Sequence, residues 1–577
     1  MCASASAASA PTRCCWARAH WCFLPSWGCR CCAAPSHRRP HEEPPMPLNI
    51  EQTIGQKLMI SFDGITPPPE LIERLSQQHV GGVTLFRHWN AGSPAQVRAL
   101  TEAIQQAAAA AGQPPLLIAA DQEGGQLVAI GGTTPFPGNM ALGATDSADL
   151  AERAGHAMGL ELAAVGVNVN YAPSCDVNVN PANPVIGVRS FGEDPAAVAR
   201  LTRAMVRGMQ AAGVAATAKH FPGHGDVASD THHGAVLVPH DRQRLDQVEL
   251  PPFAAAIEGG AKLIMTAHLG VPAYDEAALP ATLSRPIIRD LLREKLGFGG
   301  VVISDAMNMG AIAQGGNKQV DMIAAVAAGQ DLLLLMEDEA TVDMIYRSLV
   351  HAAQRQLLDL ADLAASAERV LALKRWVQQQ SQPSLGVLRS DEHLALAREI
   401  AEQSVTLVRN DSRLLPLRPA PEQQIAVVVP AMRDLTPADT SSYESCSLAD
   451  AVRRHHANTA EVQAPADPSE VEIAALCAQV AQADIVVVAT INAFMQPGQA
   501  ALVKALLASG KPVAVVALRL PYDLAEFPTA PVFACSYGVQ EPSLHALAAA
   551  LFGTIPWKGH LPVSIHGLYD RGHGIAG

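Results

Sequence analysis

Short apolar runs recur along the first three-fifths of the chain, and each ends in a polar or charged residue. The runs are rich in Val, Ile and Leu and are continuously hydrophobic rather than alternating, which is typical of strands buried on both faces of a parallel sheet. We interpret them as eight parallel strands, at residues 57–64, 80–86, 115–123, 167–176, 214–221, 261–269, 300–307 and 331–338.

Helical patterns separate these predicted strands. Apolar residues recur at i, i+4 spacing from Leu150 to Leu162, and a second helix is predicted to begin at Pro195 with Asp194 as its N-cap. Eight strand–helix units over about 320 residues favour an α/β fold of the (β/α)8 TIM-type barrel class. A doubly wound α/β sheet is the main alternative.

A second, smaller domain is expected after a helix that ends near Trp376. The stretch QQQSQPS at 378–384 has the polar composition of a linker, and four more apolar runs follow it, at 425–429, 484–490, 512–518 and 531–538. They predict a three-layer α/β sandwich without a GxGxxG or P-loop motif, so no nucleotide role is expected. The predicted boundaries are 46–377 for the barrel, 378–395 for the linker and 396–577 for the C-terminal domain.

The first 45 residues break this pattern. Seven of the eleven cysteines and three of the six tryptophans precede Met46, and Arg, Pro or Cys interrupts every apolar run, unlike the apolar core of a secretory signal. Zinc binding by Cys29, Cys31 and Cys32 is the weaker alternative, because no second cysteine pair follows them. We expect residues 1–45 to be a non-native upstream extension or a disordered leader, with translation starting at Met46.

Composition narrows the class of ligand. The chain has 577 residues, of which 49% are hydrophobic, and 41 Lys+Arg stand against 55 Asp+Glu, giving a formal charge of −14. This charge argues against nucleic acid or an anionic membrane as a partner and favours a small neutral or polar ligand. The few scattered cysteines after Met46 are typical of a reducing compartment, so a cytoplasmic location is expected. The sequence does not identify protein partners.

Six reactive side chains stand at the C-terminal ends of predicted strands. In a (β/α)8 barrel these ends converge on the face that carries the active site. Loops are polar for reasons unrelated to function, but six such residues with both signs of charge weaken that alternative. They are Asp121, Asp176, Lys219, His220, His268 and Asp305.

The densest segment is KHFPGHGDVASDTHH at 219–233, where Gly223 and Gly225 flank His224 and predict a tight loop. Its four histidines suggest a metal hydrolase. No earlier strand end offers the early His-x-His of barrel metal hydrolases, so we expect neither a catalytic metal nor a cofactor.

The pair Asp230 and His232 offers a different chemistry. A carboxylate two residues away holds one ring nitrogen of the histidine and leaves the other free for proton transfer. An isolated pair of this kind is more often a surface histidine beside an incidental acidic residue. With Asp305 at another strand end, however, the pair would place an acid/base and an anionic nucleophile at the same end of the barrel.

Several long motifs together resemble glycoside hydrolase family 3, specifically its bacterial β-N-acetylhexosaminidase branch. Beside the histidine loop they are DQEGG at 121–125, PFPGNMALGAT at 135–145, NPVIGVRSFGEDP at 183–195 and ISDAMNMGAI at 303–312. The resemblance runs from about Met46 to Trp376. The second domain resembles more loosely the C-terminal domain of two-domain members, through residues 401–417 and 559–565.

The resemblance implies a retaining exo-β-N-acetylhexosaminidase that removes terminal β-linked GlcNAc from cell-wall-derived or related glycosides, as in peptidoglycan recycling. In that family pattern Asp305 is the nucleophile of a covalent glycosyl-enzyme intermediate, and Asp230 with His232 forms the acid/base dyad. The positions that bind the sugar are Asp121, Arg189, Lys219 and His220, and Asp176 organises the site.

Two departures keep other activities open. Ala129 stands where this branch has an arginine that contacts the sugar, and Asp305-Ala306 replaces the Asp-Asp of single-domain members. A family-3 β-glucosidase, a transferase or phosphorylase using phosphate as acceptor, and a non-catalytic sugar-binding homologue therefore remain alternatives. The D-x-H pair disfavours the glucosidase, and the complete set of reactive residues disfavours the inactive homologue. Residues 441–444 form a polar cluster that either borders the barrel mouth or, the preferred interpretation, is an ordinary loop.

Overall fold

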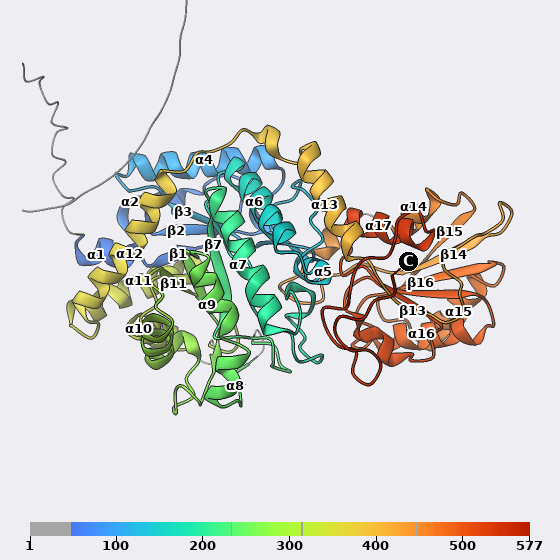
Figure 1. Ribbon diagram of the computed structural model, residues 1–577. Helices are drawn as coiled ribbons and strands as arrows, with labels where there is room; N and C mark the ends of the chain where they lie inside the picture. The colour runs from blue at the N-terminus through green and yellow to red at the C-terminus, as the bar shows by residue number, and fades with distance from the viewer. Residues whose placement is uncertain (1–47, 232–233, 313–315, 445–446, 577) are drawn as a thin grey trace, which may run out of the picture. The chain divides into compact units, whose positions relative to one another are not determined.

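The computed structural model describes residues 48–231, 234–312, 316–444 and 447–576, which form an eight-stranded parallel barrel followed by a six-stranded α/β domain (Figure 1). Each barrel strand lies inside one of the eight predicted runs, so the predicted fold class is confirmed. The strands are β1 (Leu58–Ile60), β2 (Gly82–Leu85), β3 (Leu117–Ala120), β6 (Val169–Asn170), β7 (Ala215–Phe221), β9 (Leu263–Thr266), β11 (Val301–Ser304) and β12 (Leu333–Leu335).

Strands that follow one another along the chain are also neighbours in the sheet, in the order β11-β9-β7-β6-β3-β2-β1-β12. A parallel bridge between Ile303 and Leu332 joins the two ends of this order and closes the barrel. In a doubly wound sheet the strand order reverses at a switch point. The sequential order therefore rules out the doubly wound alternative.

Alternate residues of the strands face opposite sides, as strand geometry requires. One buried cluster contains Met59, Leu117, Ala119, Val169, Tyr171, Met265, Val301 and Leu334. The residues between them, such as Ile60, Val83, Ile118 and Val302, belong to a second cluster shared with the helices. The strands are thus apolar on both faces, which explains why their sequences show no alternation.

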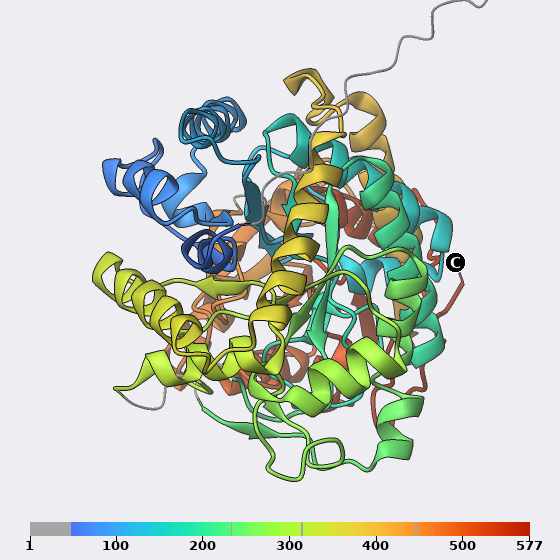
Figure 2. The same cartoon turned by 90° about the vertical axis from the view of Figure 1, so that its left-hand side faces the viewer.

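Helices surround the barrel strands (Figure 2). α7 begins as predicted, with Asp194 Oδ1 accepting a hydrogen bond from Ala197 N at 2.8 Å. The helices that cover the barrel are α1 (Ile50–Gly55), α2 (Pro69–Gln77), α4 (Pro94–Ala110), α6 (Ala148–Ala164), α7 (Pro195–Ala211), α9 (Pro251–Glu258), η3 (Pro286–Lys295), α10 (Lys318–Ala328), α11 (Glu339–Gln354) and α12 (Leu360–Gln378).

The C-terminal domain is a three-layer α/β domain. The predicted linker region contains η4 (Leu385–Val387) and the start of α13 (Asp391–Ser404). The sheet order is β13 (Thr406–Asn410), β18 (Val532–Cys535), β17 (Val513–Ala517), β16 (Ile485–Thr490), β14 (Ile425–Pro430) and β15 (Thr459–Ala464), with only β13 antiparallel to its neighbour. Helices α14 (Leu448–Arg453) and α17 (Glu541–Leu551) cover one face, and α15 (Glu470–Gln479) and α16 (Pro497–Ala508) cover the other (Figure 1).

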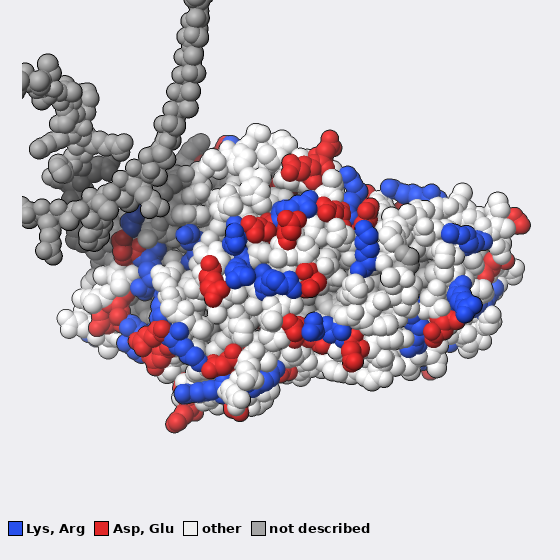
Figure 3. Space-filling view, viewed as in Figure 1, with Lys and Arg blue, Asp and Glu red and all other residues white. Residues whose placement is uncertain are grey.

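Charged side chains of both signs are interspersed over the face drawn in Figure 3. Exposed ion pairs are present as well, such as Arg153 with Glu399 at 2.8 Å. Within the described ranges, no helix combines the length and the apolar character needed to cross a bilayer.

Candidate active site

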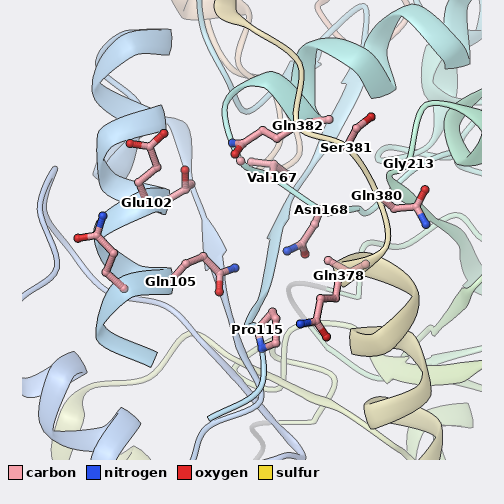
Figure 4. Close-up of a pocket in the computed structure, with 15 residues that line it drawn as sticks. Glu102, Gln105, Pro115, Val167, Asn168, Gly213, Gln378, Gln380, Ser381 and Gln382 are labelled. Carbon is pink, nitrogen blue, oxygen red and sulfur yellow. The ribbon is translucent and has the colours of Figure 1, made fainter. Parts of the chain in front are cut away.

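Two cavities lie at opposite ends of the barrel. A cavity of about 410 Å³ is lined by residues just before β3, β6 and β7, and by amide side chains such as Gln105 and Gln378 (Figure 4). Glu102 is the one charged side chain among its described lining residues. The second cavity, of about 640 Å³, is lined by residues at the C-terminal strand ends. Barrel enzymes carry their reactive groups at that end, so the second cavity is the candidate site.

The barrel brings five of the sequence-predicted site residues to this cavity: Asp121, Arg189, Lys219, His220 and Asp305. Asp121 follows β3, Lys219 and His220 lie near the end of β7, and Asp305 follows β11. Arg189 ends the short helix η1 (Gly187–Arg189). Residues far apart in the sequence therefore meet because parallel strands end at one face.

Glu123 on β4 (Gln122–Gly124) lies at the centre of a buried ionic network. Its carboxylate accepts hydrogen bonds from Arg189 Nε at 3.0 Å and Nη2 at 2.8 Å, and pairs with Lys219 Nζ at 2.6 Å. Burial alone works to raise the pKa of Glu123, but the two cations outweigh it and hold that pKa well below its usual range. Sequence reasoning missed this residue, although it stands within the DQEGG motif.

Lys219 also contacts Asp121, with 2.6 Å between Nζ and Oδ1. Burial opposes the charged form of the lysine, yet the carboxylates of Asp121 and Glu123 outweigh it and raise its pKa above the usual value. The ammonium group is therefore charged at neutral pH, although only 2% of the side chain is exposed.

Asp176, which is fully buried, orients His220. The Nδ1–H of His220 donates to Asp176 Oδ2 at 2.7 Å, and the backbone N–H of His224 donates to Asp176 Oδ1 at 2.6 Å. Burial favours the neutral acid, but the His220 interactions outweigh it and lower the pKa of Asp176. The pairing leaves Nε2 of His220 on the other side of the ring, 3.4 Å from Arg189 Nη2.

The backbone holds Asp305 in place. Its N–H donates to Thr266 O at 3.0 Å, and its Oδ1 accepts from Ala306 N at 2.8 Å. His268, also predicted at a strand end, does not line the cavity within the described chain. Its Nδ1 lies 2.8 Å from Thr282 Oγ1 and its Nε2 2.9 Å from Ala306 O, so it supports the backbone beside Asp305.

The histidine loop approaches the barrel closely at its glycines. A Cβ at Gly225 would stand 1.9 Å from Val177 O, so a side chain there has no space. Burial lowers the pKa of His224 to about 4, despite the nearby Asp176 carboxylate, and its Nε2 lies 3.1 Å from Thr231 Oγ1. His224 is therefore neutral at physiological pH and serves as a support for the loop.

The predicted dyad is only partly described. Thr231 lines the cavity, whereas its neighbour Asp230 is not among the described lining residues. His232 and His233 lie outside the described residues. No three His, Cys, Asp or Glu side chains in the described ranges are grouped as a metal site, which tests only half of the four-histidine cluster.

A loop of the C-terminal domain also lines the cavity. The loop 434–444 follows β14 and contributes Asp434, Thr440 and Tyr443 to the lining, so the preferred interpretation of residues 441–444 as an ordinary loop is wrong for Tyr443. Thr440 N donates to Gln126 O at 2.8 Å, and Thr440 Oγ1 accepts from Val128 N at 3.0 Å. No local sequence signal pointed to this contact.

Arg87, at the start of α3 (Arg87–Asn90), lines the cavity beside Ala129. Its Nη1 donates to Val128 O at 3.3 Å. The wall thus carries a guanidinium group next to Ala129, the position at which the resembled branch has an arginine. No motif in the sequence connects these two positions.

Comparison with known proteins adds to this geometry. The glycosyl hydrolase family 3 N-terminal domain matches residues 49–373, and the corresponding C-terminal domain matches residues 405–571. Beta-hexosaminidase A of Pseudoalteromonas piscicida is 34% identical over 90% of this chain and 98% of its own length. A beta-N-acetylglucosaminidase/beta-glucosidase of Cellulomonas fimi is 32% identical over 64% of this chain and 66% of its own length. The structure of a family 3 beta-N-acetylglucosaminidase from Paenibacillus sp. str. FPU-7 superposes with a TM-score of 0.86 at 39% identity, covering 90% of this chain and 99% of that one.

Proposed function

Because the chain belongs to glycosyl hydrolase family 3, we propose that it is a retaining exo-β-N-acetylhexosaminidase that removes terminal β-linked GlcNAc from cell-wall-derived or related glycosides. The observation that carries this proposal is the single cavity in which Asp305 shares a wall with Asp121, Arg189, Lys219 and His220. The full-length relative named as a beta-hexosaminidase supports the choice of sugar.

Asp305 is the nucleophile in this proposal. Its carboxylate attacks the anomeric carbon, the bond to the leaving oxygen breaks, and a covalent glycosyl-Asp305 intermediate forms, which water then hydrolyses with net retention. Asp121, Arg189, Lys219 and His220 bind the hydroxyl groups of the terminal sugar. Because buried carboxylates already hold Arg189, Lys219 and His220 in place, little reorganisation accompanies the reaction.

The acid/base is the pair Asp230 and His232. The imidazolium of His232 gives its proton to the leaving oxygen, and the neutral ring then takes a proton from the attacking water. A neutral imidazole repels the Asp305 carboxylate and the leaving group less than a second carboxylate would. Thr231, which directly precedes His232, lines the cavity, and this supports the assignment.

β-Glucosidase activity is the second candidate. Ala129 lines the cavity where the resemblance expects a sugar-contacting arginine, which relaxes the demand for GlcNAc. The Cellulomonas fimi relative carries both activities in its name. Phosphorolysis is a third outcome that the same assay separates.

The test compares aryl β-GlcNAc with aryl β-glucoside, each with and without inorganic phosphate. We expect the aryl GlcNAc to be turned over faster, with no GlcNAc 1-phosphate formed. Faster turnover of the glucoside would replace the proposal with the second candidate. Formation of a sugar phosphate at the expense of free sugar would make the enzyme a phosphorylase.

We further propose a cytoplasmic enzyme that works without a metal. EDTA is then expected to leave the aryl GlcNAc rate unchanged. Loss of activity with EDTA and its recovery with zinc would revive the histidine-cluster hypothesis. Recovery of the activity outside the cytosolic fraction of the producing cells would contradict the location.

A further inference from the structure

The histidine loop runs from the end of β7 towards the proposed acid/base pair, and the barrel holds it at two places. Near its start, the buried Asp176 carboxylate accepts from His224 N at 2.6 Å. Further along, Ala311 N donates to Thr231 O at 3.1 Å. Asp226 lies between these two contacts. Its side chain is therefore a further point at which the loop can be held.

Arg244 binds Asp226 through its guanidinium group. Arg244 stands on α8 (Arg242–Gln247), which is drawn below α9 in Figure 1. Its Nη2 donates to Asp226 Oδ2 at 3.0 Å, and its Nη1 donates to both carboxylate oxygens of Glu249, at 2.7 and 2.6 Å. His240 Nε2 lies 2.7 Å from the same Asp226 oxygen. One guanidinium group therefore joins two carboxylates.

Glu249 in turn supports the start of the loop. Gly223 has a φ of +130°, and a Cβ there would stand 2.7 Å from Cβ and from Cγ of Glu249. The loop backbone thus packs directly on the Glu249 side chain, which is 2% exposed. Burial raises the pKa of Glu249, and the charge of Arg244 opposes that rise. Arg244 therefore holds the loop at two points, directly at Asp226 and through Glu249 at Gly223.

These contacts differ from an ordinary surface ion pair. Exposed pairs contribute little, because water and salt screen them and two long side chains lose conformational entropy. Here the side chains of Asp226 and Arg244 are 21% and 28% exposed, and the planar guanidinium group binds both carboxylates at once. Removal of Arg244 would leave the buried Glu249 carboxyl group without its cation. We therefore expect Glu249 to shift, and Gly223 and Asp226 to shift with it.

Resting on the proposed function, we propose that Arg244 is a positioning residue for the acid/base: it fixes the part of the histidine loop from which Asp230 and His232 act on the leaving oxygen. Arg244 is not among the described residues that line the cavity, so it acts through the loop and not on the substrate. A general acid must lie within hydrogen-bond reach of the oxygen that it protonates, and a displacement of about 1 Å can cost on the order of 10²-fold in rate. Asp305 follows β11 and donates to Thr266 O instead, so its attack does not depend on Arg244.

Arg244→Met tests the proposal, because methionine keeps much of the apolar stem and removes the guanidinium group. We expect kcat/KM for aryl GlcNAc substrates with poor leaving groups to fall by about ten- to hundredfold. With an activated aryl leaving group, the loss should stay below about twofold. The dependence of log kcat/KM on leaving-group pKa should therefore be steeper in the variant. A uniform loss across the series would indicate general damage to the fold and would overturn the proposal.

A double-mutant cycle shows whether Arg244 acts through the acid. An enzyme that already carries His232→Ala has no general acid left to misplace. In that background, Arg244→Met should cost less than about twofold with the poor leaving groups, although it costs about tenfold or more in the otherwise wild-type enzyme. An equal loss in both backgrounds would overturn the proposal.

Three further variants keep the test specific. Arg244→Lys retains the charge but not the fork that binds two carboxylates, so it should recover only part of the rate. Asp226→Asn should reproduce the leaving-group dependence more mildly, and it keeps the proposal testable if thermal unfolding shows that Arg244→Met is not folded. The matched control is Arg242→Met, which removes an equal charge from the same helix, where Arg242 donates to Ala273 O at 2.6 Å. This control should leave the dependence unchanged.

The wild-type enzyme and His232→Ala separate the levels of failure. If the wild type does not turn over aryl GlcNAc, the proposed function fails, and this inference fails with it. If His232→Ala shows no leaving-group dependence, the acid/base assignment fails, again together with the inference. If both results are as expected but Arg244→Met behaves like Arg242→Met, or Asp226→Asn behaves like the wild type, the inference alone is overturned.

Discussion

At the scale of single residues, each basic side chain of the proposed sugar site is held by a carboxylate beside it. Glu123 holds Arg189 and Lys219, and Asp176 holds His220. These carboxylates are buried, so their hydrogen bonds are not shared with bulk water. The side chains proposed to bind the sugar are therefore positioned before the substrate arrives, which is the usual requirement for strong electrostatic stabilisation.

The first prediction concerns Asp305. Asp305→Asn should keep the thermal unfolding midpoint near that of the wild type but reduce turnover by several orders of magnitude, because an amide is a poor nucleophile and does not stabilise oxocarbenium charge. Steady-state kinetics and thermal unfolding measure the two effects. A slow fluoro-sugar substrate should label Asp305 in the wild type, and mass spectrometry that finds the label elsewhere would relocate the nucleophile.

The second prediction concerns His232. His232→Ala should cost on the order of 10² to 10⁴ in rate with a poor leaving group, the usual contribution of general acid catalysis. With an activated aryl leaving group, whose departure needs little protonation, the loss in the first step should be far smaller. Rates across a series of aryl GlcNAc substrates with different leaving-group pKa values measure this dependence.

Two neighbours serve as comparisons for His232. Asp230→Ala should show the same leaving-group dependence more mildly, because it supports the imidazole without touching the substrate. His233→Ala should be nearly silent. If His233→Ala instead shows the large, leaving-group-dependent loss while His232→Ala is silent, the dyad assignment is wrong.

Site residues differ in how well the local sequence predicts their place in the cavity. Asp121, Lys219 and Asp305 stand at the ends of apolar runs, so their convergence follows from the barrel itself. Arg87 and Tyr443 meet only because two domains pack together, and nothing in the local sequence of either residue records that contact. Ionic partners buried below a site, such as Glu123, are also hidden, because they pair with residues far away in the sequence.

At the scale of elements, the strands buried on both faces were predictable and the edge strands were not. All eight barrel strands and the inner strands β14, β16, β17 and β18 coincide with continuous apolar runs. β15 is an edge strand whose buried and exposed residues alternate, with Glu461 and Gln463 exposed, so it gives no apolar run. β13, the antiparallel strand at the other edge, also ends in polar residues.

The loop 434–444 depends on one buried ion pair. Arg519 Nη2 contacts both carboxylate oxygens of Asp439, at 3.0 and 2.7 Å, and the same carboxylate accepts from Leu435 N and Ser441 N. The side chains of Arg519 and Asp439 are 2% and 0% exposed. The pair therefore fixes the backbone of the loop that reaches the cavity.

The third prediction follows from this pair. Arg519→Met should lower the free energy of unfolding by about 3–5 kcal/mol, because it leaves the Asp439 carboxylate buried without its partner. It should also raise KM for disaccharides more than it lowers kcat on aryl GlcNAc. Urea unfolding and steady-state kinetics measure both effects.

A double variant provides the control. Arg519→Met combined with Asp439→Asn removes the buried charge altogether and should recover part of the lost stability. If the double variant is less stable than Arg519→Met alone, the carboxylate is not the source of the loss, and the role given to this pair is wrong.

At the scale of the whole molecule, hydrogen bonds join the barrel to the C-terminal domain. The proposed catalytic residues belong to the barrel, and the C-terminal domain supplies part of the pocket wall. Gln540 Nε2 donates to Gly125 O at 2.7 Å, Asn178 Nδ2 donates to the hydroxyl of Tyr522 at 3.0 Å, and Ser564 N donates to Glu193 at 2.9 Å. The order of the barrel strands was predictable in outline. This docking was not, because its donors and acceptors are scattered along the chain.

A buried carboxyl beside this junction makes stability depend on pH. Burial raises the pKa of Asp523 from 3.8 to about 7, and the Thr490 hydroxyl donates to it at 2.6 Å. The folded state therefore binds the proton more tightly than the unfolded state. This contribution is fully present below about pH 4 and is lost as the pH rises through about 7.

The fourth prediction is that Asp523→Asn reduces this pH dependence. Between about pH 5 and pH 8.5 the wild type should lose stability, by about 2–3 kcal/mol, relative to the variant, because the amide has no proton to lose. Urea unfolding at several pH values measures the difference between the two proteins. A difference that stays constant with pH would show that Asp523 is not the titrating group.

The division of the pocket wall between two domains has an evolutionary consequence. The residues that would break the glycosidic bond belong to the barrel, whereas Asp434, Thr440 and Tyr443 of the wall belong to one short segment of the other domain. Exchange of that segment by recombination, or a few point changes within it, would alter which glycosides are accepted while the residues at the strand ends stay unchanged. Relatives in which this loop diverges faster than the strand ends would differ in substrate range while keeping the same reaction mechanism.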